Sequence, residues 1–504
     1  MKTFGRSTIL ANYTEEQFLS GSEDDIKARI IEIIKDSTDI HEKNKNESRY
    51  LQDYLYGDQD IKFKEKYTRK EINNKGVENW AWAFQDWKKA FLLGKPIQYA
   101  PLDDNANEEI TVLNNYVIYE DKDQKDQDIY EDLFTVGRGF RYISYSKVGD
   151  DDEAPFDLLN LSVLNTEVVY SSSINHEQLL TYVQTDMKYN VPQVDPETNQ
   201  VVLKPVPYNE YTVYTKTMQY TANDKSGELV IIDSKPLIPQ GHRVVEYYFN
   251  RRRMSFLEIC KDIFDDLNYV ECLDKDDIEG FVNSIMVFTN AEVDKEAMDS
   301  IQSFGAVSIK STDQKKASVE LLQSRLKSLD TQIYYLRKLS ALHSILSVPE
   351  ATQSGEFSNA ETGKAVLTGQ GFTSASIRVE NEEKAFKKCD RNALKIMLKI
   401  CRDVSDSDIR TLKVSKIDIK FSRDLSDNLL TKTQALINLQ TANIPPQIAN
   451  SVIGLFSDPV AVTTLQDAYI QQKQLLQNAI NQQNGIQEQN NVIEDTQQIE
   501  NQEQ

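Results

Sequence analysis

The chain has 504 residues, and its 79 Asp and Glu residues outnumber its 57 Lys and Arg residues, which gives a formal net charge of −22. This charge opposes tight binding to nucleic-acid backbones or anionic lipid, although it allows a local basic patch. A hydrophobic fraction of 39% with 24 Tyr and 19 Phe supports folded cores, and the length predicts two to four structural units.

The cysteines and the N-terminus indicate where the protein resides. The four cysteines show no C-x-x-C motif and no nearby histidine, and each lies in an apolar helical stripe: Cys260, Cys272, Cys389 and Cys401. This pattern predicts buried free thiols in a reducing compartment. The apolar patch at the N-terminus is too short for a signal peptide, and no run approaches the roughly 20 apolar residues of a membrane span. We therefore expect no membrane partner and assembly in a cytoplasm.

Helical periodicity dominates the first hundred residues. Residues 15–56 predict a peripheral helical arm, and all three tryptophans follow in one further helix that ends at Gly94-Lys95-Pro96. One face of this helix is formed by Trp80, Phe84, Trp87 and Phe91. Such an aromatic cluster indicates a core within the chain, or alternatively a contact between subunits.

Two acid-rich segments follow. Residues 120–132 hold seven acids and two lysines, and Asp121, Asp123 and Asp132 fit three positions of a calcium loop. The position that needs glycine for the sharp turn is Asp126, so the match fails. We interpret the segment as a solvated charged helix or turn, and residues 150–153 as an acidic hairpin tip.

Residues 134–248 predict an antiparallel sheet. Apolar and polar residues alternate in short runs between polar turns. The predicted strands are Phe140–Tyr145, Glu167–Tyr170, Tyr211–Tyr214 and Leu229–Ile232. A late strand at Val414–Ser422 is expected to return to this sheet.

A basic triplet precedes the next helix. Arg251, Arg252 and Arg253 are candidates for DNA or inter-subunit contacts, with solvent exposure as the alternative. Ser255 and Glu258 form a capping box that predicts a helix start. The apolar stripe of this helix includes Ile263 and Leu267, and its other face carries Asp262, Asp265 and Asp266. A small α+β segment follows, with strand candidates at 284–289 and 306–310.

A second long helix is predicted from a seam of apolar residues spaced by four and three. The seam runs through Leu322, Leu326, Leu329, Ile333 and Leu336. This spacing predicts packing along one side of a helix, which Pro349 ends.

A polar loop and a further helix follow this seam. The loop includes Gln353, Ser354, Gly355, Glu356 and Phe357. Lys364 is the only cation between Lys338 and Arg378, so we expect the loop to touch a partner without holding it. Helical periodicity resumes through Val404.

The C-terminal region predicts helices and then disorder, and the chain lacks recognisable catalytic motifs. Residues 430–442, 446–455 and 460–480 have helical character, and the Gln/Asn-rich end predicts a disordered tail. No phosphate loop, dinucleotide fingerprint or G-x-S-x-G motif occurs, and no histidines have metal-ligand spacing. We expect no cofactor, no metal and no enzyme activity.

The order of elements and two motifs resemble the portal proteins of tailed bacteriophages, in particular those of long-tailed phages of Gram-positive bacteria. The first motif is Phe91-Leu92-Leu93-Gly94-Lys95-Pro96-Ile97-Gln98-Tyr99. The second is Phe357-Ser358-Asn359-Ala360-Glu361-Thr362-Gly363-Lys364-Ala365. Here Ser358 replaces the glycine of the family, and one residue is inserted before Thr362-Gly363.

The resemblance implies an α+β portal-type fold. Its expected parts are a wing at 1–254 with a return strand at 405–430, stem helices at 255–281 and 321–347, a clip at 282–320, a tunnel loop at 348–358, a long tunnel helix at 359–404, crown helices at 431–480 and a tail at 481–504. In this arrangement residues 353–357 form a loop of the DNA channel, and Lys364 is a possible DNA or inter-subunit contact. The apolar residues of the two stem helices pack the stem.

The resemblance also implies a structural role. Portal proteins form a ring, typically a dodecamer, at one capsid vertex, and double-stranded DNA passes through it without sequence specificity. The implied partners are the large terminase, a head-completion adaptor, and the major capsid and scaffolding proteins. The implied location is the virion. Two alternatives stay open: a carboxylate-metal nucleic-acid enzyme that uses Asp262, Asp265 and Asp266, and a non-viral cytoplasmic helical scaffold.

Overall fold

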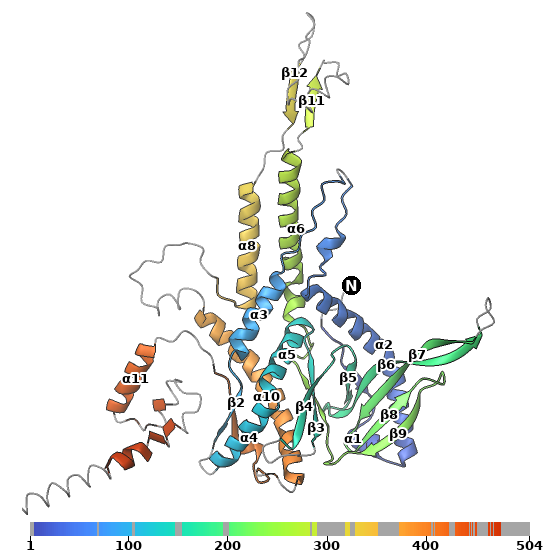
Figure 1. Ribbon diagram of the computed structural model, residues 1–504, viewed down its shortest axis with the longest axis vertical. Coiled ribbons are helices and arrows are strands. Elements are labelled where there is room, and N and C mark those ends of the chain that lie inside the picture. The colour runs from blue at the N-terminus through green and yellow to red at the C-terminus, as the bar shows by residue number, and fades with distance from the viewer. Residues whose placement is uncertain are drawn as a thin grey trace, which may run out of the picture.

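The computed structural model shows an α+β body from which two long helices rise as a stem (Figure 1). This confirms the predicted fold class. The residues that the structure describes are 5–67, 70–102, 106–146, 154–194, 201–282, 285–289, 318–322, 328–350, 372–404, 407, 409–422, 429–442, 444, 446, 449–450, 462–463, 465–466 and 468–474.

A six-stranded sheet forms one side of the body, with strand order β1-β5-β6-β7-β8-β9. Its strands are β1 (Ile9–Ala11), β5 (Thr166–Ser171), β6 (Gln178–Val194), β7 (Val201–Tyr214), β8 (Met218–Asn223) and β9 (Val230–Pro236). Strands β5 to β9 form an antiparallel meander as predicted, and β1 joins its edge parallel to β5. The predicted strand at Phe140–Tyr145 is not part of this meander, because it lies in a separate sheet. Helices α1 (Glu15–Leu19) and α2 (Glu23–Leu55) cover this sheet and complete its hydrophobic core.

The β6–β7 hairpin extends beyond its neighbours as an arm (Figure 1). From the pair Asp186 and Asn209 outward, the two strands pair only with each other. Pro192, Pro205 and Pro207 lie in this part of the arm. Because proline has no N–H to donate, these residues protect the free edges from pairing with further strands.

Two smaller sheets lie beside the six-stranded sheet; from here on, the wing means this six-stranded sheet with α1 and α2, which is a smaller unit than the expected wing of residues 1–254. One has the order β10-β3-β4, and the other pairs β13 with β2. Their strands are β2 (Gln98–Pro101), β3 (Gly139–Tyr145), β4 (Phe156–Leu161), β10 (Val244–Tyr247) and β13 (Ile417–Lys420).

The late strand was therefore placed in the wrong sheet by the sequence prediction. Strand β13 pairs antiparallel with β2, and Ile419 lies opposite Tyr99. The buried side chains of Ile417 and Ile419 join the central core rather than the wing core. The alternation in Val414–Ser422 identified a strand, but β2 is only four residues long and was not recognised as its partner.

The remaining helices pack around these sheets. They are η1 (Asp60–Phe63), α3 (Trp80–Leu93), α4 (Asn107–Tyr119), α5 (Lys122–Thr135), α6 (Phe256–Val282), α8 (Ser328–Leu346), α10 (Phe372–Asp403), η3 (Val414–Lys416) and α11 (Leu429–Thr441). Among the helices that the structure describes, none has an apolar stretch long enough to cross a bilayer.

Helix α2 is not the peripheral arm that its polar composition suggested. Near its start, Ile30 and Ile33 are buried in the wing core. Near its end, Leu51 and Tyr54 are buried in the central core. One 33-residue helix therefore connects the two cores.

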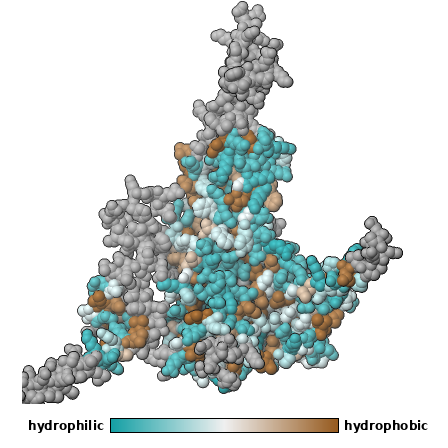
Figure 2. Space-filling view, viewed as in Figure 1, coloured by the Kyte–Doolittle hydropathy of each residue, from teal (hydrophilic) through white to brown (hydrophobic). Residues whose placement is uncertain are grey.

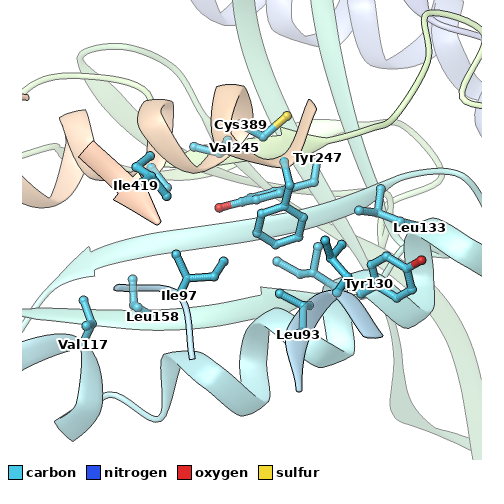
Figure 3. Close-up of a cluster of buried hydrophobic side chains, with 14 of the residues drawn as sticks. Leu93, Ile97, Val117, Tyr130, Leu133, Leu158, Val245, Tyr247, Cys389 and Ile419 are labelled. Carbon is cyan, nitrogen blue, oxygen red and sulfur yellow. The ribbon is translucent and has the colours of Figure 1, made fainter. Parts of the chain in front are cut away.

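The central core gathers side chains from segments far apart in the sequence. Figure 3 shows Leu93, Tyr130, Leu158, Tyr247, Cys389 and Ile419 converging from helices and strands. All four cysteines are buried and free, which confirms the prediction.

The stem consists of α6 and α8, and a two-stranded hairpin lies at its far end (Figure 1). Ser255 and Glu258 form the predicted capping box, with two reciprocal hydrogen bonds of 3.0 Å. The hairpin pairs β11 (Ile285–Thr289) with β12 (Ser318–Leu322).

The second stem helix begins later than the predicted residue 321. Residues 318–322 form β12, and α8 starts at Ser328. The alternation of Val319 and Leu321 suits a strand as well as a helix, and pairing with β11 decides between them. The strand candidate at 306–310 lies outside the described residues.

Candidate assembly surface and loop supports

The aromatic face of α3 holds the stem on the body. Phe84 is buried, and its ring lies 6.2 Å from that of Phe264 on α6 and 4.9 Å from that of His343 on α8. Trp80 is partly buried, and its Nε1 donates a hydrogen bond of 3.0 Å to the Tyr335 hydroxyl of α8. The partly buried Trp87 and Phe91 stack at 4.7 Å. This cluster therefore belongs to a core within the chain.

Polar contacts reinforce the base of the stem. The Tyr335 hydroxyl donates to Glu78, and burial together with this bond raises the pKa of Tyr335 to about 12. Lys338 on α8 forms an ion pair of 2.6 Å with Asp266 on α6. Helix α8 is thus held from two sides near its middle.

The apolar seam of α8 is exposed in the single chain. Leu329, Ile333 and Leu336 are 69%, 57% and 50% exposed. Within one subunit these three residues are not packed, so their predicted stem packing stays a prediction, whereas Leu342 and Leu346 further along the helix are buried. The apolar side chains are buried at one end of α8 and exposed at the other. The turns near Leu346 face α3 and α10, whereas the turns near Leu329 extend beyond the body. Figure 2 shows hydrophobic surface on this part of the stem.

A groove opens between the upper parts of the two stem helices. It has a volume of about 310 Å³ and is lined by Val270, Glu271 and Asp274 of α6 and by Thr331, Gln332, Tyr335 and Leu336 of α8. Lower on α6, Leu267 is buried and Ile263 is partly buried, as the predicted stem packing requires. The stem is therefore closed at its base and open above it.

Lys88 connects the two helix ends that flank the predicted tunnel loop. Its Nζ lies 2.6 Å from Glu382 Oε1 on α10 and donates to the backbone oxygen of Leu346, the last residue of α8, at 3.2 Å. Tyr130 donates to the other oxygen of Glu382 at 2.9 Å, and burial beside this carboxylate raises the pKa of Tyr130. Lys88 is only 2% exposed.

Arg378 adds a second link between the same two helices. Its Nη1 donates to the backbone oxygen of Ser344 at 3.0 Å and to the Ser347 hydroxyl at 2.8 Å. Two independent contacts therefore fix the end of α8 against the first turns of α10. The predicted loop residues 353–357, together with Lys364 and Leu326, lie outside the described residues.

The sequence prediction missed Lys88, Glu382 and Arg378 as supports. Lys88 follows the buried Phe84 by four residues, so it lies on the inner face of α3. A lysine on an otherwise aromatic inner face indicates a buried acidic partner, because an unpaired charge there is costly. That pattern identifies Lys88, but nothing local identifies its partner almost three hundred residues away.

The basic triplet divides into buried and exposed members. Arg253 is 8% exposed, and its guanidinium pairs with Glu246 at 2.7 Å and donates to Thr8 at 2.8 Å. The Arg253 side chain therefore makes its contacts within the subunit. Arg251 and Arg252 are exposed and remain candidates for an external contact.

Two of the three aspartates of the alternative enzyme hypothesis form structural contacts. Asp265 accepts hydrogen bonds from Tyr54 at 2.8 Å and from Lys261 at 2.6 Å. Asp266 pairs with Lys338, and Asp262 is exposed. Within the described ranges, no group of three or more His, Cys, Asp or Glu side chains is arranged to hold a metal ion.

The acid-rich segment 120–132 is a helix, but it is not a solvated one throughout. Asp126 is buried and pairs with Lys122 at 2.7 Å and with Arg141 at 2.6 Å. Lys122 also reaches Asp390 of α10 at 3.0 Å. Burial raises the pKa of Asp132 to about 8. The charges in this helix join α5, β3 and α10 into one body.

An α+β body with a two-helix stem, a hairpin at the tip of the stem and a long helix that runs from the base of the stem into the body defines the class of phage portal proteins (Figure 1). The family model described as "Phage portal protein, SPP1 Gp6-like" matches residues 34–486, and the chain belongs to this family. A comparison with curated proteins gives no match. Portal proteins are a class of structural phage proteins, and the match over residues 34–486 places the chain in this class.

Proposed function

We propose that the chain is the subunit of a closed ring, typically a dodecamer, at one vertex of the capsid. Double-stranded DNA passes through this ring during packaging and ejection, without sequence specificity. The ring assembles in the host cytoplasm with the major capsid and scaffolding proteins, and the hairpin end of its stem contacts the large terminase and later a head-completion adaptor.

The exposed seam of α8 carries this proposal. Three large apolar side chains on one helix face, beside an open groove, leave a surface that a single subunit does not cover. A head-to-tail contact repeated around a closed ring covers the same surface in every subunit. Membership of the portal family supports this reading of the exposed face.

The charge of α6 supports the passage of DNA along the stem. This helix has two lysines and nine acids, of which Glu258 and Asp276 are buried and ion-paired; the other seven are Asp262, Asp265, Asp266, Glu271, Asp274, Asp277 and Glu279. Each cation that neutralises a phosphate adds affinity through counterion release. A wall rich in acids avoids such contacts, so DNA slides past it.

Ring formation is tested with the variant Ile333→Asp, studied by light scattering and negative-stain microscopy. We expect wild-type protein to form closed rings with a central channel and the variant to remain as dissociated, folded subunits. The matched control is Ile232→Asp on β9, because both isoleucines are 57% exposed. Rings that form equally well with Ile333→Asp, or a wild-type protein that remains a monomer, would contradict the proposal.

The tunnel loop is tested separately by deletion of residues 353–357. We expect the deletion variant to form rings of normal size and to lose packaging or retention of DNA in an assembly assay. Failure of ring formation would instead show that the segment supports assembly and is not an element of the channel.

A further inference from the structure

A stripe of cations runs along α10, although the chain as a whole is strongly acidic. The members are Lys384, Lys388, Arg391, Lys395, Lys399 and Arg402, and all six are exposed. At 100° per residue they fall within about 80° of one helix face and extend over about 27 Å. Between residues 384 and 402 the only acid is the buried Asp390, which is paired with Lys122.

The described residues of the chain do not neutralise the stripe. Within the part of the chain that the structure describes, none of the six forms an ion pair, and their contacts are with neutral groups. Lys395 donates to the Asn392 side chain, Lys399 to the backbone oxygen of Gln240, and Lys388 lies over the ring of Tyr248.

A cleft of about 410 Å³ opens beside the middle of the stripe. Lys388, Lys395 and Lys399 line it from α10, and the segment 239–246 lines the opposite wall. Arg243 adds a fourth cation to the lining. The only carboxylate in the lining, Glu246, is already paired with Arg253.

The cleft also offers apolar contacts. Ile396, Tyr170 and Tyr248 contribute to its lining together with the cations. Such a mixed lining suits a ligand with both negative charge and apolar side chains. A rigid DNA duplex is too wide to enter a cavity of this size, whereas an extended peptide can enter it.

We propose that the cleft between α10 and residues 239–246 binds an acidic peptide segment of a partner protein. Carboxylates of the segment pair with the cations on α10, and an apolar side chain enters the cleft between Ile396 and the two tyrosines. The site lies within one subunit, so this proposal goes beyond the ring and channel functions and does not depend on them.

The proposal is tested by fluorescence anisotropy with a short labelled peptide of alternating Glu and Leu, added to the full chain at physiological salt. We expect binding, and we expect the double variant Lys395→Glu/Lys399→Glu to weaken it at least about tenfold. The control is Lys188→Glu/Lys204→Glu on the β6–β7 arm, which changes the net charge equally and is expected to leave binding within about twofold of wild type.

A second variant tests whether the peptide binds inside the cleft, independently of the charges that line it. Asn392→Trp fills the cleft while it leaves every lysine in place, so we expect it to weaken the peptide as well. Melting temperature and light scattering on each variant distinguish loss of binding from loss of folding or assembly. The proposal is overturned if wild-type protein does not bind the peptide, if the two double variants weaken binding equally, or if a DNA duplex displaces the peptide completely from wild-type protein.

Discussion

Single buried charges hold distant segments of this subunit together, and Lys88 is the strongest example. In Lys88→Met, Glu382 remains buried without its cation and the Leu346 backbone oxygen loses its donor. We expect the free energy of unfolding to fall by about 3–5 kcal/mol, measured by urea titration. Lys89→Met is the control, because Lys89 makes only longer contacts of 3.6 and 3.8 Å, and its loss is expected to be below about 1 kcal/mol. Equal losses in both variants would contradict the assigned role.

Asp276 gives a pH-dependent prediction near the far end of α6. It accepts bonds from Lys64 at 2.8 Å and from the Asn74 backbone at 2.7 Å. Burial alone would raise the pKa of Asp276, but these bonds outweigh it and lower the pKa to about 2. Because the folded pKa lies below the unfolded value of about 3.9, the stabilisation is complete above that value and is lost as the pH falls toward 2.

The measurement is the unfolding free energy of wild type and Asp276→Asn as a function of pH. We expect the difference between them to be constant from pH 7 to about 5 and to shrink at lower pH. The exposed neighbour Asp277→Asn serves as the control. A difference in unfolding free energy that stays constant down to pH 2 would contradict stabilisation by the ionised Asp276 carboxylate.

The residue scale is also where sequence prediction was weakest. Arg251, Arg252 and Arg253 look alike in the sequence, yet only Arg253 turns inward to Glu246. Asp126 looks like one acid among seven, yet it is buried between Lys122 and Arg141. Burial of a charge depends on a partner brought close by the fold, and local composition does not contain that information.

Elements were predicted better than their partners. The alternation in the wing strands and the capping box of α6 are local features, and the structure confirms them. Strand β13 was recognised, but its pairing with β2 depends on contacts across more than three hundred residues. The predicted start of α8 was wrong for a related reason. Residues 318–322 have helical spacing, but they pair with β11 and form a strand.

The β6–β7 arm gives a prediction at this scale. Beyond Asp186 and Asn209 its strands pair only with each other, so the fold of the wing does not depend on its outer part. Replacement of residues 189–206 by an Asn-Gly turn preserves the register that places Lys188 opposite Pro207. We expect the melting temperature of the folded subunit to change by less than about 2 °C, measured by circular dichroism. A large decrease would show that the arm supports the wing core.

For the whole molecule, α2 decides whether the two cores unfold together. Asp39 is an exposed residue within this helix, between the part in the wing core and the part in the central core. Asp39→Pro removes one helical hydrogen bond and introduces a clash that costs about 3 kcal/mol or more. We expect wild type to unfold in a single calorimetric transition and Asp39→Pro to unfold in two.

Asp39→Ala is the matched variant, because alanine keeps the backbone N–H and favours helix. Like wild type, it is expected to unfold in one transition. One transition in Asp39→Pro as well would mean that contacts other than α2 couple the cores.

The linkage through Lys88 and Arg378 has a mechanical consequence. Both residues bind the end of α8 and the beginning of α10, and Lys88 itself belongs to α3, whose inner face is buried in the central core. A force that pulls on the end of α8 or on the beginning of α10 is therefore expected to be shared among α3, α8 and α10 through these contacts. Neither α8 nor α10 would then bear such a force alone.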